Sequence, residues 1–359
     1  MRKTNLSALS QLPVAARRKG AFTLCLALCT LGLSLVASAQ EPTYTIIEVP
    51  GSHDTVPSSI NPAGAIAGTY EDASFVAHGF LRTPDGTITT LDVPGSTSTA
   101  ASRINPAGAI LGNYTDTSGV SHSFLRVPDG TYTTIDVAGS VSTGLSDINP
   151  AGTITGIYTD TSGVYHGFVR APDGTITTFD VPDSISTFSS SINPAGTITG
   201  SYWRDVTFVP HGFVRARDGT FTTFDVQDSV DTEPRSINPA GSITGIYEDA
   251  ARFVLHGFVR ARDGTITTID VPDSVSTVAV SINPAGTITG SYADARFVLH
   301  GFVRARNGTF TTFDPPGAPT IPLLGVGTEP LAINPAGAIT GFGPEDMSLN
   351  HIRGFLRSR

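Results

Sequence analysis

Short stretches in which apolar and polar residues alternate follow one another along this chain, and clusters of turn residues separate them. The segment Thr153 to Tyr158, for example, reads Thr-Ile-Thr-Gly-Ile-Tyr. Such period-two alternation is typical of β-strands, and no segment after the first forty residues shows the period of a helix. The pattern predicts an all-β protein.

The five-residue stretch Ile-Asn-Pro-Ala-Gly recurs seven times and organises the chain. Asn, Pro and Gly suit the first, second and fourth positions of a type I β-turn, because they supply an acceptor, a fixed φ and access to positive φ. Each copy is therefore expected at the tip of a hairpin. The turn asparagines are Asn61, Asn105, Asn149, Asn193, Asn238, Asn283 and Asn334.

One repeat unit contains four predicted strands. In the unit that starts at Ser191, a strand ends at Ile192, the turn follows, and a second strand covers Thr197–Tyr202. A third strand carries His211-Gly212-Phe213-Val214-Arg215, and a fourth covers Phe221–Val226 after an Asp-Gly turn. The spacing of the turn asparagines gives most units 44 or 45 residues. This length and strand count are typical of a β-propeller blade.

The two ends of the repeat array predict a closed ring. Tyr44–Gly51 matches the fourth strand of the other units, whereas the last unit reaches Arg359 without a fourth strand. A ring closes when the first strand pairs into the last blade, which removes exposed sheet edges. We therefore expect a seven-bladed propeller over residues 40–359.

The repeated motif resembles a known bacterial family. The His-Gly-Phe of each third strand follows a Gly-rich strand and precedes an Asp-Gly turn, as in the "extracellular repeat, HAF family", here with Gly for Ala. The copies His122-Ser123-Phe124 and His351-Ile352-Arg353-Gly354-Phe355 depart from it. The resemblance covers the predicted mature chain and implies an exported β-repeat protein, without an activity to transfer.

Residues 1–39 have the order of a secretory signal peptide. Arg2, Lys3, Arg17, Arg18 and Lys19 precede the apolar run 21–36, and Ala37-Ser38-Ala39 suits a cleavage site. The alternative is an uncleaved N-terminal anchor. Cleavage would release a protein to the periplasm, the cell surface or the medium, with no membrane insertion afterwards.

Composition narrows the possible partners. Both cysteines and both lysines lie in residues 1–39, so the mature chain would have no disulfide and 17 Arg against 31 acidic residues. This negative charge argues against nucleic acid as a partner. We expect a monomer that binds a carbohydrate or a protein.

One histidine per repeat suggests a structural network rather than a metal site. Copies spread around a ring cannot converge on one ion, whose bonds are about 2 Å long. We expect each histidine to reach the aspartate fourteen residues later, or nearby threonines, and we predict no metal there. The repeat histidines are His78, His122, His166, His211, His256, His300 and His351.

A second repeated set is the aspartate of the loop after each second strand. Such carboxylates could contribute to calcium sites, but each loop lacks the dense acidic pattern of calcium loops, so we favour solvated loop caps and no cofactor. The set is Asp72, Asp116, Asp160, Asp205, Asp249, Asp294 and Asp346.

A single active centre needs residues that break the repeat. The repeat-breaking residues include His53 with Asp54, and the insertion Pro315–Glu329. We selected six others as candidate ligand-binding residues, with Arg103 and Asp147 expected near the channel and the rest on loops of the variable rim: Arg103, Asp147, Trp203, Arg204, Glu233 and Arg235.

No catalytic set can be assembled from these residues by sequence alone. The favoured hypothesis is a secreted, non-catalytic binding or adhesion module that uses its variable-loop rim. The alternative is a propeller hydrolase or lyase with a single axial active site.

Overall fold

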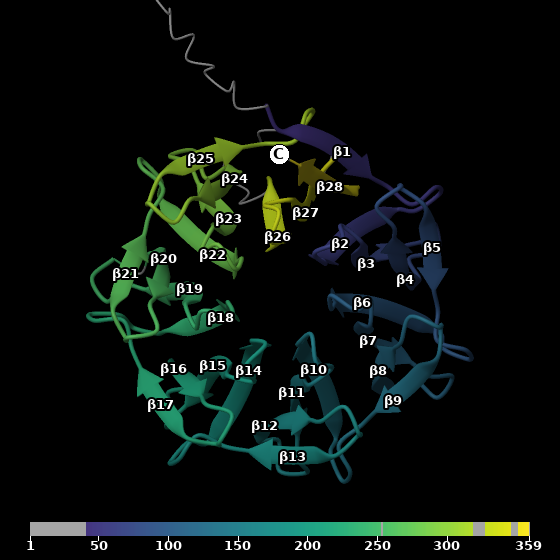
Figure 1. The fold of residues 1–359 in the computed structure, drawn as a ribbon, viewed down its shortest axis with the longest axis horizontal. Coiled ribbons are helices and arrows are strands. Elements are labelled where there is room, and N and C mark those ends of the chain that lie inside the picture. The colour runs from purple at the N-terminus through teal and green to yellow at the C-terminus, as the bar shows by residue number, and fades with distance from the viewer. Residues whose placement is uncertain (1–40, 253, 319–326, 346–350, 359) are drawn as a thin grey trace, which may run out of the picture. The chain divides into compact units, whose positions relative to one another are not determined.

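The computed structural model describes residues 41–252, 254–318, 327–345 and 351–358. The signal peptide predicted at residues 1–39 lies outside the described residues. In the described part, all regular structure is β, arranged as seven four-stranded antiparallel sheets around a central axis (Figure 1). The predicted seven-bladed propeller is confirmed. No helix in this part could cross a membrane.

The strands follow the chain blade by blade, from the innermost strand outward. The first six blades are β2 (Asp54–Ile60), β3 (Ile66–Glu71), β4 (Ala77–Arg82), β5 (Ile88–Leu91); β6 (Ser98–Ile104), β7 (Ile110–Thr115), β8 (Ser121–Arg126), β9 (Tyr132–Ile135); β10 (Ser142–Ile148), β11 (Ile154–Thr159), β12 (Tyr165–Arg170), β13 (Ile176–Phe179); β14 (Ser186–Ile192), β15 (Ile198–Trp203), β16 (Pro210–Arg215), β17 (Phe221–Phe224); β18 (Glu233–Ile237), β19 (Ile243–Glu248), β20 (Leu255–Arg260), β21 (Ile266–Ile269); and β22 (Ser276–Ile282), β23 (Ile288–Ala293), β24 (Leu299–Arg304), β25 (Phe310–Phe313). The seventh blade joins the two ends of the chain: β26 (Glu329–Ile333), β27 (Ile339–Pro344), β28 (Ile352–Ser358) and β1 (Thr43–Ile47).

The Asn-Pro-Ala-Gly stretches form the predicted hairpin turns. In the first, the Gly64 amide donates to the Asn61 carbonyl at 3.0 Å, and the Asn61 side-chain oxygen accepts the Ala65 amide. Gly64 has φ of 87°, a conformation that glycine adopts without steric cost. The turn therefore needs the residues that the sequence repeats.

The same asparagines also join the blades to one another. Each turn asparagine is 2–4 % exposed, and its Nδ2 donates to the backbone carbonyl of the turn asparagine in the next blade at 3.2–3.5 Å. The last of these bonds runs from Asn334 back to Asn61. We call this closed set of seven bonds the asparagine ring.

The hydrophobic core lies between neighbouring blades. One cluster combines Ala67 and Leu91 of the first blade with Ile104 and Phe124 of the second. The phenylalanine of each His-Gly-Phe repeat or its counterpart is at most 1 % exposed, which explains its recurrence: Phe80, Phe124, Phe168, Phe213, Phe258, Phe302 and Phe355. Each blade thus buries its apolar faces only when both neighbours are present.

The N-terminal strand closes the ring as predicted. β1 pairs antiparallel with β28, from Thr43 opposite Ser358 to Ile47 opposite Gly354. Ile47 and Val49 enter a core cluster with Phe80 of the first blade. This pairing completes the seventh sheet with a strand from the other end of the domain.

Candidate functional site

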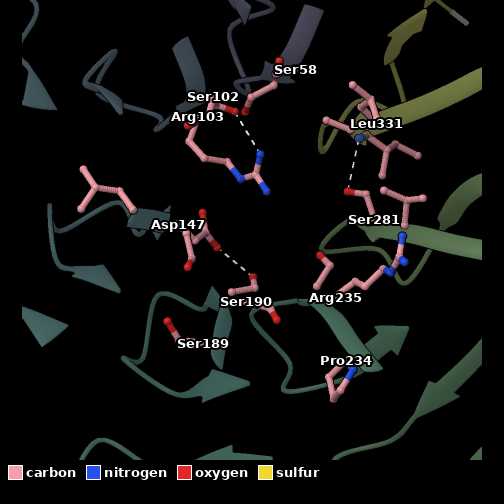
Figure 2. A pocket seen from close by; sticks show the side chains of 18 of the residues that line it. Ser58, Ser102, Arg103, Asp147, Ser189, Ser190, Pro234, Arg235, Ser281 and Leu331 are labelled. Atoms are coloured by element: carbon pink, nitrogen blue, oxygen red, sulfur yellow. Dashed lines mark hydrogen bonds between the residues drawn. The ribbon is translucent and has the colours of Figure 1, made fainter. Parts of the chain in front are cut away.

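An axial cavity of about 640 Å³ lies among the innermost strands of the blades (Figure 2). All seven inner strands contribute to its wall, which is rich in serine side chains. A cavity of this size falls within the range that holds small-molecule ligands. Four repeat-breaking side chains line this cavity: Arg103, Asp147, Glu233 and Arg235.

A β-bulge in each inner strand shapes the cavity wall. In β6, for example, the ladder shifts between Ala101 and Arg103, so Ser102 is the extra residue. Bulges re-aim side chains and are frequent next to active sites. In every blade, the bulged residue and the one after it both line the cavity. The pairs are Ser58 and Ser59, Ser102 and Arg103, Ser146 and Asp147, Ser190 and Ser191, Arg235 and Ser236, Val280 and Ser281, and Leu331 and Ala332.

Arg103 and Asp147 face the cavity from adjacent blades, as the sequence suggested. Within the described part of the chain, the Arg103 guanidinium makes one hydrogen bond, to the Ser102 carbonyl at 3.0 Å. Figure 2 shows the guanidinium directed into the cavity. Most of its donors are therefore available to a ligand.

Asp147 is held at both carboxylate oxygens. One accepts the Ile148 amide at 2.9 Å, and the other accepts the Ser191 hydroxyl at 2.8 Å and the Ile192 amide at 3.0 Å. Burial raises the pKa of this carboxyl, although Arg103 and these donors act in the opposite direction. Asp147 nevertheless keeps part of its surface open, because it lines the cavity.

Glu233 and Arg235 also line the cavity, which corrects their predicted place on a rim loop. Both belong to β18, where Glu233 pairs with Ile246, and Arg235 is the bulged residue after Pro234. Their side chains form a half-exposed ion pair at 3.7 Å. The rim prediction was wrong because EPRSI lacks the Ser-Thr start that four of the other inner strands have, and the local sequence does not reveal the bulge.

Trp203 and Arg204 lie elsewhere. Trp203 is the last residue of β15 and packs against Phe188, Tyr165 and Phe208, with ring centroids 4.7, 6.2 and 5.1 Å away. Arg204 donates to the Tyr202 hydroxyl at 3.1 Å. The tryptophan thus fills a gap between the third and fourth blades. Neither residue is among those that line the axial cavity.

In six blades the repeat histidine contacts the aspartate fourteen residues later, as expected. His256 shows the arrangement: Nδ1 lies 2.8 Å from Asp270, and Nε2 lies 3.1 Å from the loop aspartate Asp249. Tyr247 stacks on the imidazole with ring centroids 5.1 Å apart. The aspartate contacts fix these histidines on the outer strands, away from the axis.

His351 does not occupy the corresponding place in the seventh blade. Two extra residues separate it from Gly354, so Arg353 takes the ladder position next to that glycine. Arg353 forms ion pairs with Glu48 and Glu345, where five of the other blades have a histidine between two aspartates (an Asp-His-Asp set). The assignment of His351 to the repeated network is therefore corrected.

The loop aspartates act as turn caps in the described loops. Asp72, for instance, accepts the backbone amides of Ser74 and Val76 at 2.8 and 3.0 Å, and these bonds lower its pKa. Asp346, and residues 319–326 of the Pro315–Glu329 insertion, lie outside the described residues. In the other described loops, too, the aspartate side chain accepts hydrogen bonds from backbone amides of its own loop.

The chain is similar in fold to several solved structures. No family model matches the chain, and no curated protein matches it. Among solved structures, one chain from a structural and mechanistic analysis of two prolyl endopeptidases matches with a TM-score of 0.56 and 13 % identity, over 82 % of this chain and 47 % of that one. Puromycin hydrolase matches with a TM-score of 0.55 and 12 % identity, over 85 % and 55 %.

A third match is the propeller domain of the Trilobed protease from Pyrococcus furiosus, which has an open velcro topology. Its TM-score is 0.55 at 10 % identity, over 80 % of this chain and 91 % of that one. The chain spans 63 % of the TolB chain from Acinetobacter baumannii, at a TM-score of 0.48, and about half of the prolyl endopeptidase chain and of puromycin hydrolase. At such identities the likeness shows the propeller fold alone.

The favoured hypothesis from the sequence, a non-catalytic binding module that uses its variable rim, is corrected. Four of the six candidate residues line the axial cavity, and two of them, Glu233 and Arg235, were expected on the rim. This placement favours the alternative, an axial site.

Proposed function

We propose that this protein is a propeller enzyme of the hydrolase or lyase class, with one active site in the axial cavity. The observation that carries the proposal is convergence. Arg103, Asp147, Glu233 and Arg235 break the repeat in three different blades, yet all four line one cavity. One convergent set of ionisable groups in a cavity is what a single active centre requires.

The cavity suits a small anionic substrate. Arg103 keeps most of its N–H donors unused by the protein, and a guanidinium binds carboxylate or phosphate groups in a two-pronged manner. The serine hydroxyls around it can donate further hydrogen bonds. The same cation can stabilise negative charge that develops during hydrolysis or elimination.

Asp147 is the best candidate for proton transfer. Burial raises the pKa of its carboxyl, and a carboxyl with a perturbed pKa in a cavity is a candidate acid or base. The bonds from Ser191, Ile148 and Ile192 fix its position. In the proposed site Asp147 gives a proton to the substrate or takes one from it, while Arg103 holds the anionic group.

The test is steady-state turnover of a defined panel by the chain without residues 1–39. The panel contains 4-nitrophenyl esters, small lactones and uronic acid oligomers, so that hydrolysis and elimination are both covered. Turnover of at least one class is expected. Arg103→Gln and Asp147→Asn should each lower kcat/KM by about 100-fold or more, as expected for loss of a charge-stabilising or proton-transfer group.

The matched control is Arg296→Gln. Arg296 is 63 % exposed and pairs with Asp294 on an outer loop, so its replacement should leave turnover unchanged. No turnover across the panel, or turnover that survives both cavity substitutions, would contradict the proposal.

We also infer that the enzyme works outside the cytoplasm, in the periplasm or beyond. The charged, apolar and small-residue order of residues 1–39 and the resemblance to an extracellular repeat family support this. Intact-mass measurement of the exported protein would show whether those residues are removed.

A further inference from the structure

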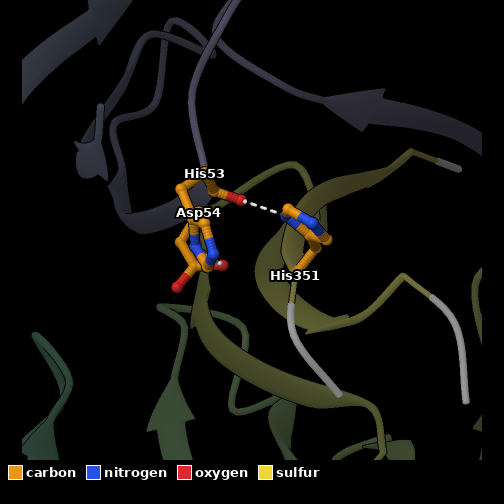
Figure 3. Close-up of side chains that lie close together, drawn as sticks. All are labelled: His53, Asp54 and His351. Carbon is orange, nitrogen blue, oxygen red and sulfur yellow. Dashed lines mark hydrogen bonds and ion pairs between the residues drawn. The ribbon is translucent and has the colours of Figure 1, made fainter. Parts of the chain in front are cut away.

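Closure of the ring brings three repeat-breaking side chains together: His53, Asp54 and His351 (Figure 3). One ligand-type atom from each lies within 4.8 Å of the others. The three come from the two ends of the domain, because His53 and Asp54 precede and begin β2, and His351 directly precedes β28. They form a group only in the closed propeller.

None of the three residues serves the repeat. His53 stands where other blades have Thr97, Val141, Ile185, Val230 and Val275. Asp54 stands where four of them have serine, and the repeat place of His351 is taken by Arg353. The aspartate contacts that explain the repeat histidines therefore do not explain why these three residues lie together.

The ring nitrogens of His351 also have different contacts from those of the repeat histidines. In His256, for example, aspartates contact both ring nitrogens. In His351, Nδ1 contacts the His53 carbonyl at 3.1 Å, an arrangement in which Nδ1–H donates and the lone pair lies on Nε2. Such a backbone contact is what commonly orients a metal-binding imidazole.

The side chains of His53 and Asp54 also have atoms that an ion could bind. Within the described part of the chain, the buried Nδ1 of His53 has no hydrogen-bond partner, although it lies 3.3 Å from an Asp54 oxygen. That oxygen accepts the Ile352 amide at 2.7 Å, which ties Asp54 to β28, and among the residues that the structure describes none donates to its second oxygen. The ring of Phe75 covers His53, with centroids 4.5 Å apart.

We propose that His53, Asp54 and His351 bind one divalent transition-metal ion of the zinc type. Two imidazoles and one carboxylate are a common zinc donor set, and a water would complete a tetrahedron. With bonds of about 2.1 Å, tetrahedral ligand atoms lie about 3.4 Å apart. Side-chain rotations that move the ligand atoms by about 1 Å therefore complete the site. The ion joins the first blade to the seventh and strengthens ring closure, independently of the axial cavity.

The test uses zinc alone with the tag-free chain lacking residues 1–39. Isothermal titration should show one saturable site, and zinc should raise the melting temperature. Cobalt(II) in place of zinc should give the visible absorption of a tetrahedral site. Asp54→Asn and His351→Gln should each weaken zinc binding by more than about 100-fold, beyond the effect of losing a residue that only supports a ligand through a hydrogen bond.

His166→Gln is the matched control, because it removes a repeat histidine of the Asp-His-Asp type. It should leave the zinc affinity unchanged even if it lowers the melting temperature. His53→Gln gives a further variant if His351→Gln fails to fold. Absence of a one-to-one site in the wild type, or unchanged affinity in the folded variants of this group, would overturn the proposal.

Discussion

Asn193 shows how a single side chain can serve two levels of the structure. Its Oδ1 accepts the Ala195 and Thr197 amides and so closes the hairpin turn, while its Nδ2 donates to the Asn238 carbonyl of the next blade. Because the residue is 3 % exposed, water cannot replace either contact. The recurrence of asparagine, rather than serine or aspartate, follows from the need for an acceptor and a donor on one side chain.

Asn193→Asp should destabilise the propeller, because it keeps the acceptor and removes the donor. The Asn238 carbonyl would lose its partner, and a buried carboxylate would face it, at a cost of about 1–3 kcal/mol. Urea unfolding measures the change. Asn307→Asp is the control, because Asn307 is exposed and the corresponding residue in other blades is aspartate. Equal stability of the two variants would contradict this role.

The Asp-His-Asp sets make stability depend on pH. A hydrogen bond with Asp136 raises the pKa of His122 above 6.5; burial lowers the pKa of His166 and His256, but their aspartates outweigh it and raise the pKa overall. A group whose pKa is raised by folding stabilises the folded state below its unfolded pKa. That contribution is lost as the pH rises through the raised value.

The free energy of unfolding should therefore fall as the pH rises from about 6.5 towards the raised folded-state values. Denaturant unfolding at a series of pH values measures this slope. The triple variant of His122, His166 and His256 to Gln should flatten it. A wild-type slope that persists in the triple variant would assign the effect to other groups.

At the scale of strands and hairpins, the sequence predicted most of what the structure shows. The turn asparagines, the strand at Thr197–Tyr202 and the match of Tyr44–Gly51 to a fourth strand all depend on local patterns, so one sequence suffices. The bulge that turns Arg235 to the axis leaves no local signal, because register depends on the partner strand. For the same reason the asparagine ring, a contact between blades, was not predicted.

Trp203 joins β15 to aromatic neighbours in two blades. Trp203→Ala should lower the free energy of unfolding by about 1–3 kcal/mol, less than a fully buried aromatic because the ring is partly exposed. Val206→Ala, at a residue 80 % exposed, is the control. Urea unfolding of both variants decides: a neutral Trp203→Ala would mean that its aromatic neighbours contribute little.

For the whole molecule, closure by β1 is the decisive contact. Deletion of residues 41–50 should expose the edge of β28 and remove Ile47 and Val49 from the core. At about 25 cal/mol per Å² of apolar area, the loss should reach several kcal/mol, and the free edge should promote aggregation. Size-exclusion chromatography and thermal melting test this. A monomer with an unchanged melting temperature would show that β1 is dispensable.

The pairing of β1 with β28 also has a kinetic consequence. Within a blade, each hairpin joins neighbouring segments and can form early, whereas β1 must wait for a partner at the far end of the chain. Six other third strands carry nearly the same sequence, so β1 can dock on the wrong blade while the seventh is incomplete. Refolding should therefore include a slow phase in which such mispaired rings reopen.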